Sequence, residues 1–281
     1  MKKGISIALA LVLCLGLLAG CGAADSVAPQ AGAADAAQTT SGKLSLGGST
    51  SVEKVIQAMM EAYMAENPGV TITYAPTGSG TGIQGASDGT LDIGLSSRSL
   101  KDAEKEKLTE TTFALDGIAV IVNSENTVTD LDLETLAKIY KGEITNWKEV
   151  GGKDGAIVLI GRDAASGTRD GFESIVNVKE ECAYAEEQAS TGAVVASVQS
   201  NAGAIGYVSL SAVNDAVKAL SVGGVVPSEE SVKDGSYQIQ RPFVFATQSA
   251  KTSDAAKAFL DWAISANTTE LVKNAGAVPV A

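Results

Sequence analysis

Residues 161–172 bring together the side chains that proteins commonly use to bind an oxyanion. The relevant residues are Arg162, Ser166, Gly167 and Thr168. They follow an apolar run at 157–160 that predicts a buried strand, and they lead into a predicted helix at 171–176. A helix N-terminus offers unpaired N–H groups and partial positive charge, and a guanidinium suits a tetrahedral oxyanion. In the alternative interpretation, Ser166 or Thr168 only caps the helix and Arg162 pairs with Asp163.

Earlier predicted strands also end in hydroxyl and glycine residues, in loops at 47–51, 77–82 and 96–99. The candidate hydroxyls in these loops are Thr50, Ser51, Ser79 and Ser97. In open α/β sheets the carboxyl ends of the strands form the edge where ligands bind. The loop at 77–82 lacks the lysine of a nucleotide-binding P-loop, which argues against nucleoside triphosphates. Thr50 and Glu53 also fit a capping box, in which case Thr50 would serve its own helix.

The composition is that of a globular protein. The chain has 281 residues, 45% hydrophobic and 19% charged, enough for one large domain or two smaller ones. Its formal net charge of −12 argues against nucleic acid as a partner. At physiological salt, charges are screened over roughly 8 Å, so the net negative charge of the chain does not prevent an anion from binding where the local groups are favourable. The sequence contains no histidine, so the usual base for a serine or cysteine nucleophile is missing.

The N-terminal sequence predicts export and lipid attachment. Two lysines precede an apolar run that ends in Leu-Ala-Gly-Cys at 18–21, which resembles the bacterial lipoprotein processing box. We expect residues 1–20 to be a lipoprotein signal peptide, Cys21 to carry the lipid, and residues 21–42 to form a flexible tether. Cys182 then has no partner for a disulfide, and we interpret it as a structural thiol.

Two long apolar runs, at 113–123 and 237–246, exceed ordinary strand length and predict segments that cross between two domains. The other predicted elements are helices at 131–140, 191–200, 253–264 and 268–274, and a strand at 203–208. If the second run returns the chain to the first domain, the last two helices pack there. The oxyanion loop at 161–172 then belongs to the second domain, and the three earlier loops belong to the first.

Several short motifs occur in the order found in one known family. They are Gly-Ser-Thr-Ser at 48–51, Gly-Ser-Gly at 78–80, Asp-Ile-Gly-Leu-Ser-Ser-Arg at 92–98, Asp-Gly-Ile-Ala-Val-Ile-Val-Asn at 116–123, Gly-Glu-Ile-Thr-Asn-Trp at 142–147, Arg162 with Ser-Gly-Thr-Arg-Asp at 166–170, and Gly-Ala-Ile-Gly-Tyr-Val at 203–208. From about residue 43 onward the chain resembles the phosphate-binding protein of bacterial phosphate ABC transporters. The resemblance implies an α/β, type II-like periplasmic-binding-protein fold with two crossing hinge strands. Lobe 1 would comprise residues 43–120 and 243–281, and lobe 2 residues 121–242.

By position, the resemblance assigns phosphate binding to Thr50, Ser51, Ser79 and Ser97 of lobe 1 and to Arg162, Ser166, Gly167 and Thr168 of lobe 2. Better-known members have an aspartate at the place of Ser97, and it accepts a hydrogen bond from protonated phosphate. Sulfate has no such proton at neutral pH, so the acceptor distinguishes the two anions. We expect Asp116 to take this role, followed by Asp163 and Asp170. Alternatively, Asp163 and Asp170 pair with Arg162 and Arg169, and Arg98 either contacts the ligand or orients an acid.

The resemblance thus predicts a lipid-anchored protein on the outer face of the bacterial cytoplasmic membrane. It would capture inorganic phosphate and pass it to the permease and ATPase subunits of an ABC transporter. We expect a monomer with no cofactor, no metal and no catalytic residue. The nearest alternative is the same fold binding sulfate or molybdate. A secreted phosphatase and a sensory or adhesive surface protein are further alternatives.

Overall fold

The computed structural model describes residues 41–248 and 250–280. These described residues belong to one compact unit. The predicted signal peptide, Cys21 and the predicted tether as far as residue 40 lie outside the described residues. Within the described ranges, no helix is long and apolar enough to cross a membrane.

The strands form one large mixed sheet and one small pair. They are β1 (Gly42–Gly48), β2 (Val70–Pro76), β3 (Ile93–Ser96), β4 (Leu108–Asn123), β5 (Asp130–Leu131), β6 (Val158–Arg162), β7 (Glu186–Gln188), β8 (Ala204–Ser209), β9 (Val217–Ala219), β10 (Ser221–Val222), β11 (Gln240–Gln248) and β12 (Val278–Pro279). The large sheet has the order β2-β1-β3-β11-β4-β8-β6-β7, with β9 and β12 also paired to β4, while β10 pairs with β5. β1 runs parallel to β2 and β3, and β6 runs parallel to β7 and β8. β11 is antiparallel to both β3 and β4.

The helices begin at polar caps that the sequence supplies. They are α1 (Glu53–Glu66), α2 (Ser79–Asp88), α3 (Asp102–Lys105), α4 (Leu133–Tyr140), α5 (Gly167–Val176), α6 (Thr191–Ser200), α7 (Glu229–Lys233), α8 (Asp254–Ala263) and α9 (Thr269–Asn274), with 3-10 turns at Trp147–Val150, Leu210–Ala212 and Ala266–Thr268. Asp132, Ser166, Ser190 and Ser253 each accept a backbone N–H at the start of α4, α5, α6 and α8. Such a cap satisfies one of the N–H groups left unpaired at a helix start, so it fixes where the helix begins.

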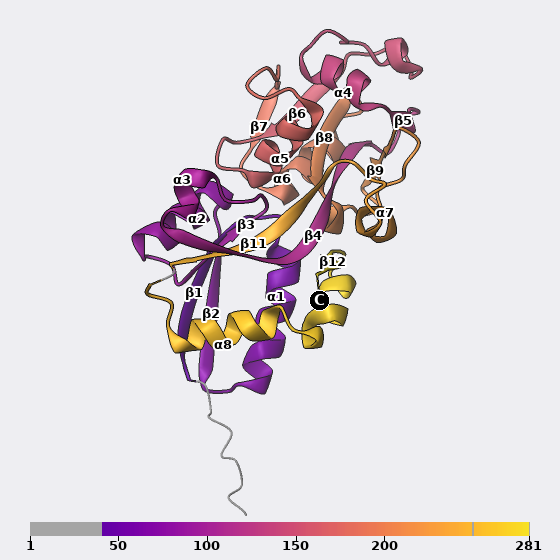
Figure 1. Ribbon diagram of the computed structural model, residues 1–281. Helices are drawn as coiled ribbons and strands as arrows, with labels where there is room; N and C mark the ends of the chain where they lie inside the picture. Colours follow the sequence, from indigo (N-terminus) through magenta and orange to yellow (C-terminus); the bar gives the residue numbers. More distant parts are fainter. Residues whose placement is uncertain (1–40, 249, 281) are drawn as a thin grey trace, which may run out of the picture. The chain divides into compact units, whose positions relative to one another are not determined.

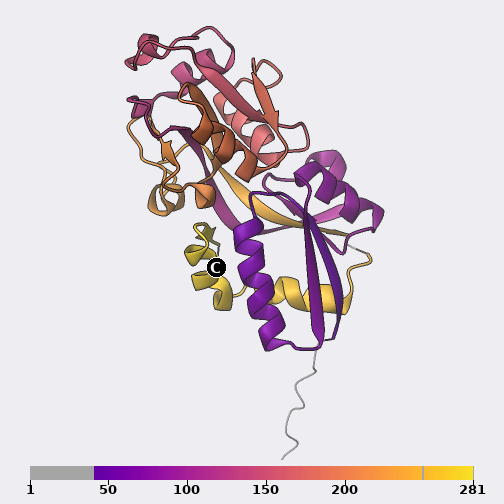
Figure 2. The same cartoon turned by 180° about the vertical axis from the view of Figure 1, so that it is seen from behind.

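Each lobe has its own hydrophobic core. The first core joins β1, β2 and β3 to α1, α8 and α9, and it extends to Ala114 on β4 and Phe243 on β11. The second core contains Ile118 on β4 and Ile239 just before β11. β4 and β11 therefore pass from one lobe to the other, as predicted for the two long apolar runs. Figure 1 shows these strands side by side between the lobes, and Figure 2 shows the same crossing from behind. The exact lobe boundaries stay predictions.

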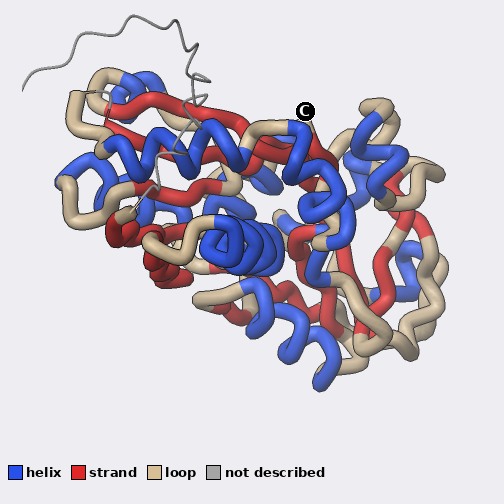
Figure 3. Tube along the Cα trace, turned by 90° about the horizontal axis from the view of Figure 1, so that it is seen from below, coloured by secondary structure: helices blue, strands red, loops and turns tan. Residues whose placement is uncertain are grey.

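In the second lobe, β4 is buried on both faces. Ile118 and Val120 belong to the core formed with α4 and α5, whereas Ala119 and Ile121 pack with α6. Side chains alternate between the two faces of a strand, so a strand covered on both faces needs an almost continuous apolar run. This requirement explains the long apolar run at 113–123. Figure 3 shows the helices lying against the strands of the sheet.

The predicted elements are largely present. The helices expected at 131–140, 191–200, 253–264 and 268–274 are confirmed as α4, α6, α8 and α9, with small shifts at their limits, and the strand at 203–208 is confirmed as β8. The predicted two-lobe α/β architecture is confirmed as well. β7 and α7 are short elements that the sequence pattern does not indicate.

Candidate functional site

The helices that matter for the site begin where strands of the large sheet end. α1 follows β1 and α2 follows β2 in the first lobe, while α5 follows β6 and α6 follows β7 in the second. All predicted binding residues except Asp116 lie at these strand ends or helix starts, or directly after β3. Their side chains are buried, and so is Gly167. The arrangement gathers helix N-termini, hydroxyls and one guanidinium at the junction of the lobes.

The start of α1 differs from the prediction. α1 begins at Glu53, with Val52 at the N-cap and no side-chain cap, so the expected capping box is wrong. Thr50 Oγ1 instead lies 3.1 Å from Thr191 Oγ1 and accepts a hydrogen bond from Arg162 Nη2 at 3.2 Å. These partners come from the second lobe. The Thr50 hydroxyl therefore does not cap α1, and it bonds to residues of the second lobe instead.

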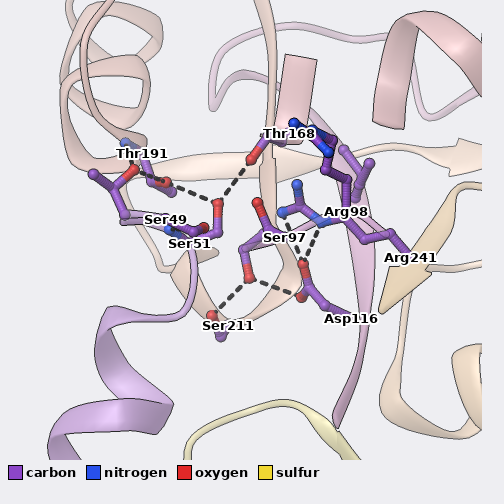
Figure 4. Close-up of polar contacts among 12 residues, drawn as sticks. Ser49, Ser51, Ser97, Arg98, Asp116, Thr168, Thr191, Ser211 and Arg241 are labelled. Carbon is purple, nitrogen blue, oxygen red and sulfur yellow. Dashed lines mark hydrogen bonds and ion pairs between the residues drawn. The ribbon is translucent and has the colours of Figure 1, made fainter. Parts of the chain in front are cut away.

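Hydroxyl groups of the two lobes meet directly. Ser51 Oγ lies 2.8 Å from Thr168 Oγ1 and 3.2 Å from Thr191 Oγ1. Figure 4 shows Ser51, Thr168 and Thr191 pointing toward one another from separate elements. The lobes are thus in contact at the candidate site, which is a closed arrangement.

Glycine allows a second close approach between the lobes. Ser79 Oγ accepts a hydrogen bond from Ser97 N at 3.0 Å and lies 3.2 Å from Ser97 Oγ. A Cβ on Gly167 would lie 2.4 Å from Ser79 Oγ and 2.8 Å from Ser97 Oγ. Only a residue without a side chain can bring the start of α5 so close. Gly80 N also donates to Ala165 O at 2.9 Å, which adds a backbone bond between the lobes.

We call this set of buried groups the cradle. It consists of Thr50, Ser51, Ser79, Ser97, Arg162, Ser166, Gly167, Thr168 and Thr191. The two interpretations of the loop before α5 each hold in part. Ser166 Oγ caps α5 by accepting from Arg169 N at 3.3 Å, whereas Thr168 turns its hydroxyl to Ser51 of the other lobe. The pairing of Arg162 with Asp163 is not formed.

Arg162 is the cation of the cradle and is 2% exposed. Its Nε donates to Gln188 O at 3.0 Å, its Nη2 to Ala189 O at 3.2 Å, and its Nη1 to Thr191 Oγ1 at 3.4 Å. All these acceptors are neutral. Burial lowers the pKa of Arg162 to about 10, so the group stays protonated at neutral pH. The negative charge of Asp163 opposes this shift, but no hydrogen bond joins its carboxylate to the guanidinium. A buried guanidinium that bonds only to neutral oxygens is a favourable position for an anion.

Asp116, the expected acceptor for a phosphate proton, is held in a buried ion pair at the crossing strands. Arg241 donates Nε and Nη2 to Asp116 Oδ2 at 3.1 and 2.9 Å, as drawn in Figure 4. Ser209 Oγ donates to Oδ1 at 2.7 Å, and the backbone of Leu210 also bonds to the carboxylate. Burial acts to raise the pKa of Asp116, and the charge of Arg241 opposes this. A carboxylate has about four acceptor positions, and here all are engaged.

Asp163 contrasts with Asp116. Its Oδ1 is buried and has no hydrogen-bond partner among the residues that the structure describes. Its chain neighbour Arg162 bonds to neutral acceptors instead. The expectation that Asp163 pairs with Arg162 is therefore wrong, and the carboxylate keeps an acceptor position available.

Asp170 also has other partners than expected. Its carboxylate lies 3.1 Å from Lys179 Nζ and 3.9 Å from both Arg98 Nε and Lys101 Nζ. The expected pairing with Arg169 is wrong, because that arginine binds two glutamates, Glu173 and Glu187. Asp170 therefore links the second lobe to basic residues of the first.

Arg98 orients an acid. Its Nη1 and Nη2 each donate to a different oxygen of Glu104 at 2.8 Å, and Nη1 also donates to Ser99 O. The charge of Arg98 additionally faces Asp170 across the junction. Of the two roles that the sequence left open for Arg98, these contacts favour the second.

Sequence reasoning does not single out Thr191 or Arg241. Thr191 follows the cap Ser190 and precedes Gly192, so the hydroxyl-glycine pattern of the other loops is repeated at the predicted start of α6. Arg241 is the one charged residue in the apolar run at 237–246. A charge inside a buried run is a signal in itself, because it requires a buried partner.

The cradle offers donors and a cation, which suit binding. Among residues 41–248 and 250–280, no group of three or more histidine, cysteine, aspartate or glutamate residues is placed to hold a metal ion. Cys182 is half-buried and donates its thiol to Val178 O at 3.5 Å. Burial raises the pKa of Cys182 to about 11, so the group is a thiol at neutral pH, consistent with a structural role.

Known proteins match the chain over most of its length. A family model described as a PBP superfamily domain matches residues 33–267. The phosphate-binding protein PstS of Bacillus subtilis is 33% identical over 285 residues, covering 99% of this chain and 95% of the relative. PstS of Borreliella burgdorferi is 31% identical over 246 residues, covering 83% and 88%.

Solved structures that resemble this chain are also described as phosphate-binding proteins. A structure from Clostridium perfringens, described as a candidate substrate-binding protein of a phosphate ABC transporter with bound phosphate, is 39% identical with a TM-score of 0.83, covering 85% of this chain and all of its own. An ABC-type phosphate transport receptor from Vibrio cholerae is 32% identical with a TM-score of 0.72, with the same coverage. The chain therefore belongs to the PBP superfamily and, within it, to the PstS family of phosphate-binding proteins.

Proposed function

We propose that this protein captures inorganic phosphate between its two lobes, outside the cytoplasm, and delivers it to an ABC transporter. The observation that carries the proposal is the buried guanidinium of Arg162, whose acceptors are all neutral and which lies among hydroxyls of both lobes. An oxyanion there gains charge-assisted hydrogen bonds from a guanidinium that otherwise bonds only to neutral oxygens. The PstS relatives and the phosphate-bound structure from Clostridium perfringens support phosphate as that anion.

The binding groups would come from both lobes. The first lobe contributes Thr50, Ser51, Ser79 and Ser97, and the second contributes Arg162, Ser166, Gly167 and Thr168, to which the contacts of Thr191 add a ninth residue. In the second lobe, the N–H groups at the start of α5 add their partial positive charge. Since hydroxyls of both lobes already lie within 2.8 to 3.2 Å of one another, small rearrangements would let them bond to an anion instead.

The mechanism is conformational. A ligand that contacts both lobes binds the closed state more tightly than an open one, so it shifts the population toward closure. The crossing strands β4 and β11 provide the connection about which the lobes would move. The closed shape is what the permease and ATPase subunits would recognise. No bond is made or broken, in agreement with the binding role in the names of the relatives.

Selection of phosphate over sulfate requires an acceptor for the phosphate proton. Asp116 has its acceptor positions engaged by Arg241, Ser209 and Leu210. Asp163 has a buried Oδ1 without a hydrogen-bond partner in the described part of the chain. We therefore assign the acceptor role to Asp163 ahead of Asp116, and a role in holding Arg241 to Asp116.

Isothermal titration calorimetry of the purified protein with phosphate, sulfate and molybdate tests this function. We expect phosphate to bind most tightly. Preferential binding of sulfate or molybdate would assign the same fold to another oxyanion. Release of phosphate from an aryl phosphate at enzymatic rates would instead support a phosphatase.

The cellular location also belongs to the proposal. We propose that residues 1–20 are removed, that Cys21 is lipidated, and that the chain is held as a monomer at the outer face of the bacterial cytoplasmic membrane. Mass spectrometry of the membrane fraction should find a lipid-modified Cys21 as the first residue. A Cys21→Ala variant recovered in the membrane fraction to the same extent as the wild type would contradict lipid anchoring.

A further inference from the structure

The buried pair between Asp116 and Arg241 leaves one donor of the arginine unused. Nε and Nη2 of Arg241 both bond to Asp116 Oδ2, whereas Nη1 is buried and has no hydrogen-bond partner within the described ranges. Because the guanidinium is planar, Nη1 points away from the carboxylate that holds the other two nitrogens. Native structures rarely keep a buried donor without a partner, and a ligand-binding site is one reason to do so.

The strand order places Arg241 next to the first lobe's half of the cradle. β11 lies between β3 and β4 in the sheet. Its Val244 pairs with Ser96 on β3, and its Arg241 pairs with Asp116 on β4. Ser97 directly follows β3, so Arg241 stands on the strand adjacent to this cradle hydroxyl.

The side chain of Arg241 also lies close to Gly171 of α5, one turn after the cradle residue Gly167. A Cβ on Gly171 of α5 would lie 3.7 Å from Arg241 Cδ. One turn earlier on the same helix, a Cβ on Gly167 would lie 2.8 Å from Ser97 Oγ. Arg241 and Ser97 therefore both pack against the first turns of α5, where the cradle begins.

Two buried guanidinium groups lie close enough to repel each other at the cradle, although the charge of Asp163 also acts on one of them. Arg162 and Arg241 are both buried, and Asp116 is the carboxylate that bonds to one of them. Burial lowers the pKa of Arg162 to about 10, and the positive charge of Arg241 acts in the same direction. An oxyanion that accepts hydrogen bonds from both guanidinium groups would remove the repulsion between them.

We propose that Arg241 is a further ligand-binding residue, whose Nη1 donates a hydrogen bond to an oxygen of the bound oxyanion. Asp116 is then a positioning residue that fixes the guanidinium through Nε and Nη2. The inference rests on the proposed function, with inorganic phosphate as the ligand. In this arrangement the oxyanion would contact two guanidinium groups, one from β6 and one from the crossing strand β11.

The conservative variant Arg241→Lys separates a binding role from a purely structural one. A lysine keeps the positive charge beside Asp116. Its compact ammonium cannot pair with the carboxylate and also donate a hydrogen bond to a ligand on the opposite side. We expect calorimetry to show a phosphate Kd raised about 10- to 100-fold, which is the usual effect of losing one charge-assisted hydrogen bond. The thermal midpoint without phosphate should stay close to that of the wild type. A phosphate Kd within about twofold of the wild type would overturn the proposal.

Arg98→Lys is the matched control, because Arg98 also donates two hydrogen bonds to one carboxylate but has no unpartnered buried nitrogen. Its phosphate Kd should stay within about threefold of the wild type. The wild-type titration keeps the two proposals apart. Absence of phosphate binding by the wild type refutes the proposed function, whereas normal binding with an unaffected Arg241→Lys variant refutes only the role of Arg241.

A crystal structure of the wild-type protein with inorganic phosphate tests the same contact without depending on a stable variant. We expect Arg241 Nη1 within about 3.2 Å of a phosphate oxygen. Phosphate bound in the cradle with Nη1 bonded only to water or to protein acceptors would overturn the proposal.

Discussion

Two arginines are buried where the lobes meet, and they differ in how they relate to aspartate. Arg162 is followed directly by Asp163, yet the two form no hydrogen bond, and the guanidinium bonds to neutral oxygens. Arg241 and Asp116 are separated by 125 positions and form a close ion pair whose side chains are almost fully buried. Adjacency in the chain therefore does not decide which charges pair in the fold.

The difference indicates separate tasks for the two regions. The pair between Asp116 and Arg241 joins the crossing strands β4 and β11, and it is neutral overall without a ligand. The loop with Arg162 and Asp163 contains a guanidinium that bonds only to neutral oxygens and a carboxylate oxygen, Asp163 Oδ1, without a hydrogen-bond donor. A hydrogen phosphate ion, which brings negative charge and one proton, complements both. We therefore expect loss of the Asp116 charge to affect mainly stability, and variants of Arg162 and Asp163 to affect mainly binding.

Asp116→Asn should have the largest effect, on the free energy of unfolding. The substitution removes the negative charge that Asp116 places beside the buried Arg241, which typically costs about 3–5 kcal/mol. Urea denaturation without phosphate measures this loss. The double variant Asp116→Leu with Arg241→Met should recover most of it, because an apolar pair of similar volume needs no charge partner. A loss below about 1 kcal/mol for Asp116→Asn would contradict a structural role of the pair.

Arg162→Gln should act in the opposite way. It removes the cation without breaking an ion pair, so urea denaturation should show an unchanged or higher stability of the phosphate-free protein. Phosphate binding should weaken by about 2–5 kcal/mol, as is typical when one partner of a buried charge pair is truncated. Arg98→Gln is the control, and calorimetry should show a much smaller change. Wild-type affinity in Arg162→Gln would exclude this residue from the site.

Asp163→Asn should change selectivity more than stability. An amide can donate as well as accept, so it no longer repels sulfate or favours a protonated ligand. We expect the ratio of sulfate Kd to phosphate Kd to fall about tenfold, which corresponds to one hydrogen bond to a charged group. The exposed Asp154 of the same lobe provides the control variant Asp154→Asn. An unchanged ratio in Asp163→Asn would mean that another group accepts the proton.

The sequence predicts the parts of the site that depend on local patterns. Strand, loop and helix follow one another within a few residues, so Ser79, Ser97 and Arg162 could be placed at strand ends from the apolar runs alone. Their convergence followed from the rule that ligands bind at the carboxyl ends of strands. The two crossing segments could be predicted for a similar reason, because a strand that traverses two cores needs an unusually long apolar run.

The remaining contacts depend on which strands become neighbours, and no local pattern determines that. The pair between Asp116 and Arg241 exists because β4 and β11 lie side by side in the sheet. Thr50 fits a capping box in the sequence, but Arg162 and Thr191 of the other lobe bind its hydroxyl in the fold. Tertiary partners therefore decided the role of a residue whose local preference pointed elsewhere.

Asp170→Asn should have the smallest effect on phosphate affinity, because Asp170 belongs to a more exposed cluster of charges than Arg162 or Asp116. The Asp170 side chain is 26% exposed, and 3.9 Å separates its carboxylate from Arg98 and Lys101 of the first lobe. Partly exposed pairs of this kind contribute about 0–1 kcal/mol. Calorimetry at low salt should show phosphate binding weakened less than about fivefold, with Asp254→Asn as an exposed control. At 1 M salt, where charges are screened over about 3 Å, the difference from the wild type should vanish. A defect that persists at 1 M salt would mean that Asp170 acts on the cradle directly, as the buried charges do, and not by attraction between the lobes.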